Sequence, residues 1–231
     1  MSENIKKTTK AFRVDLDSSE NQSILKPIAR PFNNQAHQVN EAAKKIYELI
    51  KNAKHSNDGI VLNHNKIKEA FFSPFKPQLK NAQVFLSHSH ADKNEALEVK
   101  NYLESETNHK VFVDSLFWDY KDDVLNELAK YDDISRIKDA FTLILRESLQ
   151  DMIEKCPYFV FLQSKNSVSN QELSRITYSA WIYEELKIAH SISESRPIPM
   201  MESMQVFHDI SPFLEHLETI TLKKLSQQIN S

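Results

Sequence analysis

The chain has 231 residues, of which 40% are hydrophobic, and a formal net charge of −3 from 29 basic and 32 acidic residues. This length supports one substantial core with room for a small second unit. The near balance of charge predicts no nucleic-acid partner, which would need a clustered basic surface. No apolar run approaches the roughly 20 residues that span a bilayer. The first ten residues lack the apolar centre of a signal peptide, so we expect a cytoplasmic protein with no membrane contact.

Gly59 is the only glycine in the chain, and this count excludes two common nucleotide-binding devices. A phosphate-binding loop of the Walker type needs two glycines, and the dinucleotide-binding Rossmann fingerprint needs three. Any nucleotide must therefore be held without a glycine-rich cradle. Cys156 is the only cysteine, so neither an internal disulfide nor a thiolate metal site can form.

The first 80 residues are predicted to precede the main domain. Residues 1–35 are polar and lack periodicity, which predicts a flexible tail or arm. Residues 36–80 predict a small helical prefix. Within it, apolar residues at helical spacing indicate one helix over 40–54 and a shorter one over 65–72.

From residue 82 onwards, the pattern predicts strands that alternate with helices. Short apolar runs indicate buried strands at 84–86, 110–114, 158–162, 198–201 and 218–221. Helical patterns lie between them, including a long stretch over 120–156. Alternation of this kind implies right-handed crossovers and a parallel sheet covered by helices on both faces. We therefore predict an α/β domain with five parallel strands over residues 82–231.

Ligands of such sheets bind beyond the carboxyl ends of the strands. The segments at these ends are Ser87–Asp92, Asp114–Tyr120 and Gln163–Glu185. They read Phe85-Leu-Ser-His-Ser-His-Ala-Asp92, then Phe112-Val-Asp-Ser-Leu-Phe-Trp118, then Ser179-Ala-Trp-Ile-Tyr-Glu-Glu-Leu186 after a serine-rich stretch. In order and spacing these motifs resemble the TIR (Toll/interleukin-1 receptor) domain family, over about two thirds of the chain.

This resemblance implies a flavodoxin-like sheet and one of two activities: homotypic protein interaction, or cleavage of the nicotinamide–ribose bond of NAD. In cleaving members the Glu of the Trp-x-x-x-Glu motif is catalytic, and it corresponds to Glu185 here. The neighbouring Glu184 is the alternative candidate for the catalytic residue. The resemblance also makes the segment from Asp114 to Tyr120 a loop that shapes the pocket and joins neighbouring protomers.

NAD cleavage can be catalysed by a site with few functional groups. Nicotinamide leaves as a neutral molecule, and one carboxylate can stabilise the positive, oxocarbenium-like transition state. Aromatic rings can stack on the substrate. The predicted substrate-binding residues are Ser87, His88, Asp114, Phe117, Trp118 and Trp181. Trp181 is equally suited to pack its helix on the sheet.

Similarity to stand-alone bacterial members implies an anti-phage defence effector or signal producer that takes NAD as substrate and needs no cofactor or metal. It also implies a homo-oligomer held by TIR–TIR contacts, or assembly with a partner defence protein. The main alternative is a non-catalytic interaction module. A further alternative is a zinc hydrolase that uses His88, His90 and Asp92, although Lys93 stands where that motif needs another histidine.

Overall fold

The structure is a computed structural model that describes residues 9–25, 36–52, 54–56, 59–61, 63–73, 80–130, 134–171, 174–194 and 208–230. The chain divides into two compact units. Unit 1 draws on residues 1–29, 81–115 and 149–231, and unit 2 draws on 30–80 and 116–148. This division differs from the three consecutive segments expected, because residues 116–148 group with the helical prefix and not with the sheet.

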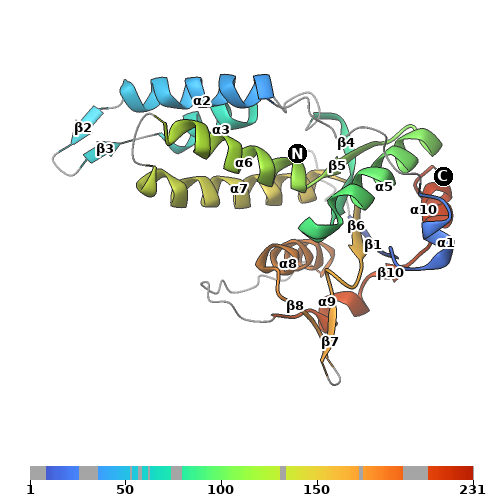
Figure 1. The fold of residues 1–231 in the computed structure, drawn as a ribbon. Helices are drawn as coiled ribbons and strands as arrows, with labels where there is room; N and C mark the ends of the chain where they lie inside the picture. Colours follow the sequence, from blue (N-terminus) through green and yellow to red (C-terminus); the bar gives the residue numbers. More distant parts are fainter. Residues whose placement is uncertain are drawn as a thin grey trace, which may run out of the picture. The chain divides into compact units, whose positions relative to one another are not determined.

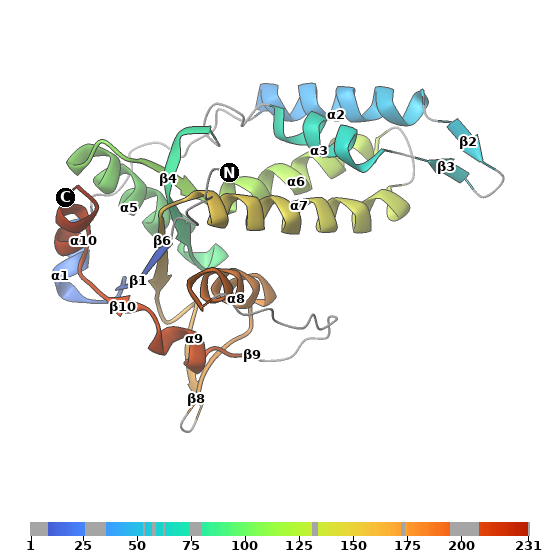
Figure 2. The same cartoon turned by 180° about the vertical axis from the view of Figure 1, so that it is seen from behind.

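Unit 1 is built on a five-stranded parallel sheet in the order β10-β1-β6-β4-β5. Its strands are β1 (Lys10–Asp15), β4 (Ala82–Ser87), β5 (Lys110–Val113), β6 (Tyr158–Gln163) and β10 (Glu218–Thr219). Helices α5 (Lys93–Glu106) and α10 (Leu222–Ile229) lie on one face, and α8 (Ala180–Glu194) lies on the other (Figures 1 and 2). The predicted α/β class with a five-stranded parallel sheet is confirmed.

Strand β1 comes from the segment that the sequence pattern had assigned to a flexible tail. It pairs along its whole length with β6 and, on its other side, with β10. Phe12 and Val14 are buried on alternate positions, so apolar burial fixes the register of this strand. The expectation of a tail is therefore wrong for residues 10–15.

The position of β1 also explains how five strands give a flavodoxin-like order. Numbered in chain order and read from β5, the strands stand in the order 3-2-4-1-5, so β1 fills the place beside β6 that the fourth strand takes in the flavodoxin order 2-1-3-4-5. The strand expected over 198–201 lies outside the described residues. The one expected over 218–221 is present as β10.

Several shorter elements complete unit 1. They are α1 (Ser19–Gln22), the 3-10 turn η2 (His90–Asp92), α9 (Ser211–Glu215) and a small antiparallel sheet of β7 (Ser169–Gln171), β8 (Ser174–Thr177) and β9 (His208–Asp209). This small sheet lies in and beyond the segment that the family resemblance presents as a loop.

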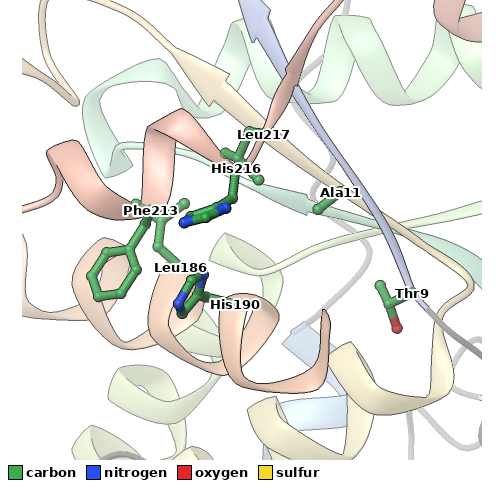
Figure 3. A pocket seen from close by; sticks show the side chains of 7 residues that line it. All are labelled: Thr9, Ala11, Leu186, His190, Phe213, His216 and Leu217. Atoms are coloured by element: carbon green, nitrogen blue, oxygen red, sulfur yellow. The ribbon is translucent and has the colours of Figure 1, made fainter. Parts of the chain in front are cut away.

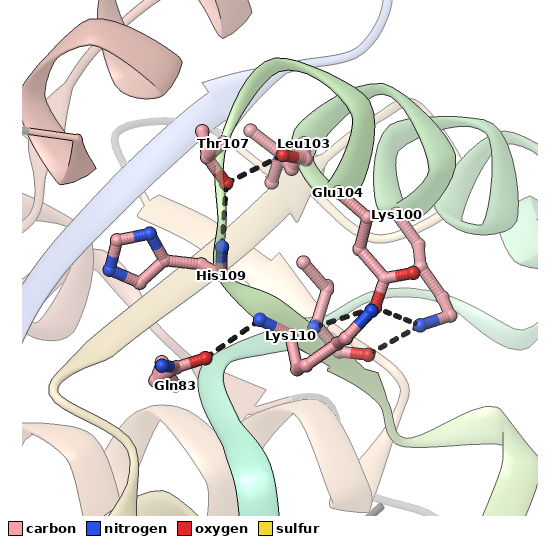
Figure 4. A network of polar contacts seen from close by, with 8 residues as sticks. Gln83, Lys100, Leu103, Glu104, Thr107, His109 and Lys110 are labelled. Atoms are coloured by element: carbon pink, nitrogen blue, oxygen red, sulfur yellow. Dashed lines mark hydrogen bonds and ion pairs between the residues drawn. The ribbon is translucent and has the colours of Figure 1, made fainter.

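The outer edge of β5 is covered by side chains of α5 (Figure 4). The Glu104 carboxylate accepts the Val111 N–H at 3.0 Å, and the Lys100 ammonium donates to the Val111 carbonyl at 2.8 Å. Lys100 and Glu104 also pair with each other at 2.6 Å. The two side chains thus occupy the hydrogen-bonding groups that an added strand would use.

Unit 2 contains α2 (Ala36–Lys51), α3 (His64–Phe72), most of α6 (Ser115–Leu128) and most of α7 (Ser135–Lys155), with a hairpin of β2 (Lys54–Ser56) and β3 (Gly59–Val61). Phe71 lies at its centre and contacts Tyr120 and Phe141 edge to face, with ring centroids 4.9 and 5.3 Å away. Helices α2 and α3 correspond to the two helices predicted in the prefix. In the part of the chain that the structure describes, no helix is long and apolar enough to cross a membrane.

Candidate active site

The carboxyl ends of β4 and β5 bring four buried polar residues together. Ser87 ends β4 and His88 follows it, while Asp114 and Ser115 follow the end of β5. All four are at most 4% exposed. The Asp114 carboxylate accepts the backbone N–H of Ser115 at 2.8 Å, which holds it at the start of α6. Three of the four, Ser87, His88 and Asp114, were predicted as site residues.

Glu185 projects toward this group from α8. The Ser179 hydroxyl accepts the Ile182 N–H at 3.3 Å and so caps the start of this helix. Ile182, Leu186 and Ala189 are each 1% exposed and mark the face that packs on the sheet. Glu185 lies on that same face and is 0% exposed. A carboxylate at such a position is unusual, because ionisable groups are rarely fully buried unless they are paired.

Four side chains of this cluster, all except that of Asp114, lack well-formed hydrogen bonds. Among the described residues, no partner with good geometry exists for Ser87 Oγ, Ser115 Oγ, His88 Nε2 or either carboxylate oxygen of Glu185. Each buried polar group left in this state destabilises the fold by about 1–3 kcal/mol. Contacts among these side chains therefore do not satisfy the cluster fully, and a ligand or an ordered water molecule could supply further partners.

The electrostatics of the cluster keep Glu185 protonated. Burial raises the pKa of Glu185 well above its usual value, and the negative charge of Asp114 raises it further. The nearby Ser87 hydroxyl opposes this shift by favouring the carboxylate form. Two neighbouring carboxyl groups in a dry site cannot both ionise readily, so the protonated form of Glu185 is favoured.

His88 is the basic side chain in contact with Asp114. Its Nδ1 atom lies 2.5 Å from Asp114 Oδ1, in an ion-pair contact whose angle is not that of a well-formed hydrogen bond. Burial acts to lower the pKa of His88, but the charges of Asp114 and Asp92 outweigh it and leave the pKa above its usual value. Asp114 therefore contacts one basic group and lies beside one carboxyl group, Glu185.

The structure distinguishes Glu185 from its neighbour Glu184. The Glu184 side chain is 17% exposed and faces Lys187 Nζ at 3.6 Å, whereas no cation among the described residues pairs with Glu185. Trp181, one turn earlier on α8, is partly exposed. Of the two acidic residues, only Glu185 belongs to the buried cluster.

The segment after β5 is not the loop that the family resemblance implied. Residues 115–128 form α6, which begins directly after Asp114. No glycine or proline interrupts this segment, and the Asp114 carboxylate binds the first N–H of the helix. Phe117 and Trp118 lie within α6, but their side chains fall outside the described ones. Their predicted stacking on a substrate stays a prediction.

The three side chains of the zinc alternative are not arranged around one point. His88 contacts Asp114, and His90 is exposed. Asp92 occupies the N-cap position of α5, yet its carboxylate does not cap the helix. It accepts instead from the Ser164 hydroxyl and the Asn166 amide, each at 2.5 Å. No group of three His, Cys, Asp or Glu side chains among the described residues could hold a metal ion.

Two features of the site were missed at the sequence level. Ser115 lies inside a strand-end segment that was singled out, but its hydroxyl was not considered. The bonds of Asp92 to Ser164 and Asn166 tie the loop after β4 to the loop after β6. The sequence signal for this tie is slight: an acid and a serine, each shortly after an apolar strand.

The site is closed in this structure, and a cavity that α8 lines in part lies elsewhere. That cavity has a volume of about 180 Å³. It is lined by Thr9, Ala11, Leu186, His190, Phe213, His216 and Leu217 (Figure 3). None of these is a predicted site residue. Since Glu185 is 0% exposed, a substrate can reach its carboxylate only after the surrounding elements move.

Comparison with known proteins gives no relative for this chain. No family model, no curated protein and no solved structure matches it.

Proposed function

We propose that the protein is a TIR-like NAD glycohydrolase in which Glu185 is the catalytic carboxylate. One observation carries the proposal: the Glu185 carboxyl is fully buried at the carboxyl ends of β4 and β5, and neither oxygen has a well-formed hydrogen bond. Strongly perturbed carboxyl groups at such positions are frequent at functional sites. The spacing of Trp181 and Glu185 within the Trp-x-x-x-Glu motif supports the same assignment.

The proposed chemistry starts with the bond between nicotinamide and ribose. The bond breaks heterolytically, its electron pair leaves with nicotinamide, and the ribosyl carbon becomes positively charged. Glu185 in its ionised form stabilises this charge, and the Ser87 hydroxyl is placed to bind a ribose hydroxyl. Attack of water on the ribosyl carbon then gives ADP-ribose, and attack of a group within the molecule gives a cyclic ADP-ribose-type product with one water less. By resemblance, we propose a role in anti-phage defence.

Access to Glu185 is the step that such an enzyme must control. The closed site has to open, and Glu185 has to release its proton when the cationic substrate arrives. We propose that assembly of several copies, or contact with a partner defence protein, favours the open form. Substrate sites bury most of their ligand, and a second copy would supply surface that one copy lacks.

A non-catalytic TIR-like interaction module is the second candidate. The complete burial of Glu185 favours it, because a carboxyl that never opens to solvent has no substrate to act on. In that case the cluster holds the start of α6 and the position of α8 on the sheet, and the protein functions through its contacts with partners.

Incubation of the full chain with NAD separates the two candidates. The NAD glycohydrolase releases free nicotinamide in step with the loss of NAD, and chromatography of the mixture measures both. Absence of nicotinamide over a wide range of protein concentration, with the chain folded, contradicts the enzyme and leaves the interaction module.

A further inference from the structure

His88 has a second ring nitrogen, Nε2, that no side chain in the described part of the structure contacts with a hydrogen bond. Its Nδ1 faces the Asp114 carboxylate at 2.5 Å, so the ring is anchored through that atom. Its Nε2 is buried and has no hydrogen-bond partner among the described residues. The ring is 3% exposed and follows directly after Ser87 at the end of β4. A histidine held at one nitrogen by a carboxylate and open at the other is an arrangement suited to proton transfer.

The groups around His88 come from three parts of unit 1. Asp114 follows β5, Asp92 and Lys93 stand at the start of α5, and Glu185 reaches the cluster from α8 beside Asp114. The two aspartates favour the protonated ring and Lys93 opposes it. Asp92 is itself held by Ser164 and Asn166, so the charge that it places near His88 has a fixed position.

Glu185 cannot fill the role of proton acceptor in the same turnover. Its proposed task is to remain ionised beside the positive ribosyl carbon, and a carboxyl group that takes up a proton loses the charge which that task needs. The reaction therefore requires a separate base if the group that attacks the ribosyl carbon carries a proton.

We propose that His88, positioned by Asp114, accepts the proton of an oxygen nucleophile that attacks the ribosyl carbon. This inference rests on the proposed NAD cleavage. It names water or a ribose hydroxyl as the nucleophile, since an adenine ring nitrogen needs no base to attack. His88 is then a second catalytic residue, and Asp114 is a positioning residue that acts through it.

The step balances with water as the nucleophile. The carbon–nitrogen bond to nicotinamide breaks, the water oxygen forms a bond to the ribosyl carbon, and one water proton passes to the Nε2 lone pair of His88, whose ring is neutral at the start of the step. His88 then releases this proton to solvent. NAD and water give nicotinamide, ADP-ribose and one proton. A ribose hydroxyl in place of water gives a cyclic product by the same transfer, and its mass is that of ADP-ribose less one water.

Azide provides the test, because it attacks carbon without losing a proton. The full chain and His88→Gln are incubated with NAD and a series of azide concentrations. Mass spectrometry measures ADP-ribose, any cyclic product and ADP-ribosyl azide. General bases contribute about a hundredfold or more to such steps. We expect the ratio of oxygen-derived product to azide product to fall by about that factor in His88→Gln, while azide product still forms.

Controls separate this inference from the proposed function. Glu185→Gln is expected to lower the oxygen-derived and azide products together and to leave their ratio unchanged. Asp114→Asn should lower the ratio in the same direction as His88→Gln, and the double variant should lower it no further. His88→Asn provides a second folded variant, with folding checked by thermal denaturation.

Three results would overturn the inference. An unchanged product ratio in a folded His88 variant refutes the role of His88 and leaves NAD cleavage intact. An equal loss of both products also refutes it, because a merely structural histidine has that effect. No nicotinamide from the unaltered chain refutes NAD cleavage and this inference together.

Discussion

The polar groups at the two ends of strands β4 and β5 differ in how well they are hydrogen-bonded. At the amino end of β5, Gln83, Lys100 and Glu104 form hydrogen bonds of 2.7–3.0 Å to the backbone of Lys110 and Val111 (Figure 4). At the carboxyl end, Ser87, Ser115 and Glu185 are more deeply buried and have no well-formed hydrogen bonds. The first arrangement stabilises the sheet, and the second destabilises it.

This contrast supports the proposal that the cluster at the carboxyl end is functional. A buried carboxyl group without well-formed hydrogen bonds lowers the stability of a fold, whereas a ligand site can use such a group. The contrast also predicts how the two clusters respond to substitution: changes at the amino end should lower stability, and changes at the carboxyl end should lower activity.

The largest expected effect is on NAD cleavage. Glu185→Gln keeps the shape of the side chain and removes its charge, so the rate should fall at least about a hundredfold, as expected for loss of a group that stabilises transition-state charge. Glu184→Gln is the matched control and should change the rate much less, because Glu184 faces Lys187 outside the cluster. Initial rates of nicotinamide release measure both. The assignment is wrong if the Glu184 variant is the slower enzyme.

The second effect is a gain in stability at the same position. Glu185→Met replaces a buried carboxyl that lacks well-formed hydrogen bonds by an apolar side chain of similar length. The free energy of unfolding should rise by about 1–3 kcal/mol, the usual cost of an unsatisfied buried polar group. Glu184→Met, measured beside it by urea denaturation, should bring no gain. A clear loss of stability in Glu185→Met would mean that the carboxyl is a structural element.

The third effect is the pH dependence of that gain. The folded state raises the pKa of Glu185 above the 4.5 expected in the unfolded chain. Stability from this group is present below pH 4.5 and is lost as the pH rises from there toward the raised value. The advantage of Glu185→Met over the unaltered chain should therefore grow as the pH rises from 4.5. His88 acts equally in both proteins and cancels. Urea denaturation over a pH series measures the difference, and a gain that shrinks with rising pH would contradict the assigned burial.

The smallest effect concerns the paired cluster at the edge of β5. Glu104→Gln weakens the bonds to Val111 and Lys100 and should lower the free energy of unfolding by about 0.5–1.5 kcal/mol. The exposed Glu106 on the same helix is the control, and Glu106→Gln should have almost no effect. NAD cleavage should be unchanged in both variants. Greater loss in the Glu106 variant would show that the edge cluster does not stabilise β5.

The parts of the fold and site that the sequence could predict are those that depend on local patterns. The helix that carries Glu185 shows apolar residues at helical spacing. Because ligands of parallel sheets bind beyond the carboxyl ends of the strands, the sequence also indicated Ser87, His88 and Asp114 without knowledge of their contacts. Burial of Glu185 on the same face as Leu186 also follows from helical geometry. Such features need only a few neighbouring residues to be recognised.

The parts that could not be predicted depend on distant pairings. Strand β1 is short and lies in a polar segment, and it is stabilised by β6, almost 150 residues further along the chain. The alternation of Phe12 and Val14 is its only local signal. The start of α6 was not predicted for another reason. The family resemblance placed a loop after Asp114, although no residue in the local sequence breaks a helix.

The most direct test of the central claim is the specific activity of the chain toward NAD over a wide range of protein concentration, with molecular mass measured in the same samples. The claim is that a closed polar site around Glu185 opens for NAD when copies assemble. Nicotinamide release per molecule should then rise with concentration and with mass, and Glu185→Gln should abolish it at every concentration. A folded chain that forms assemblies but releases no nicotinamide at any concentration would contradict the claim.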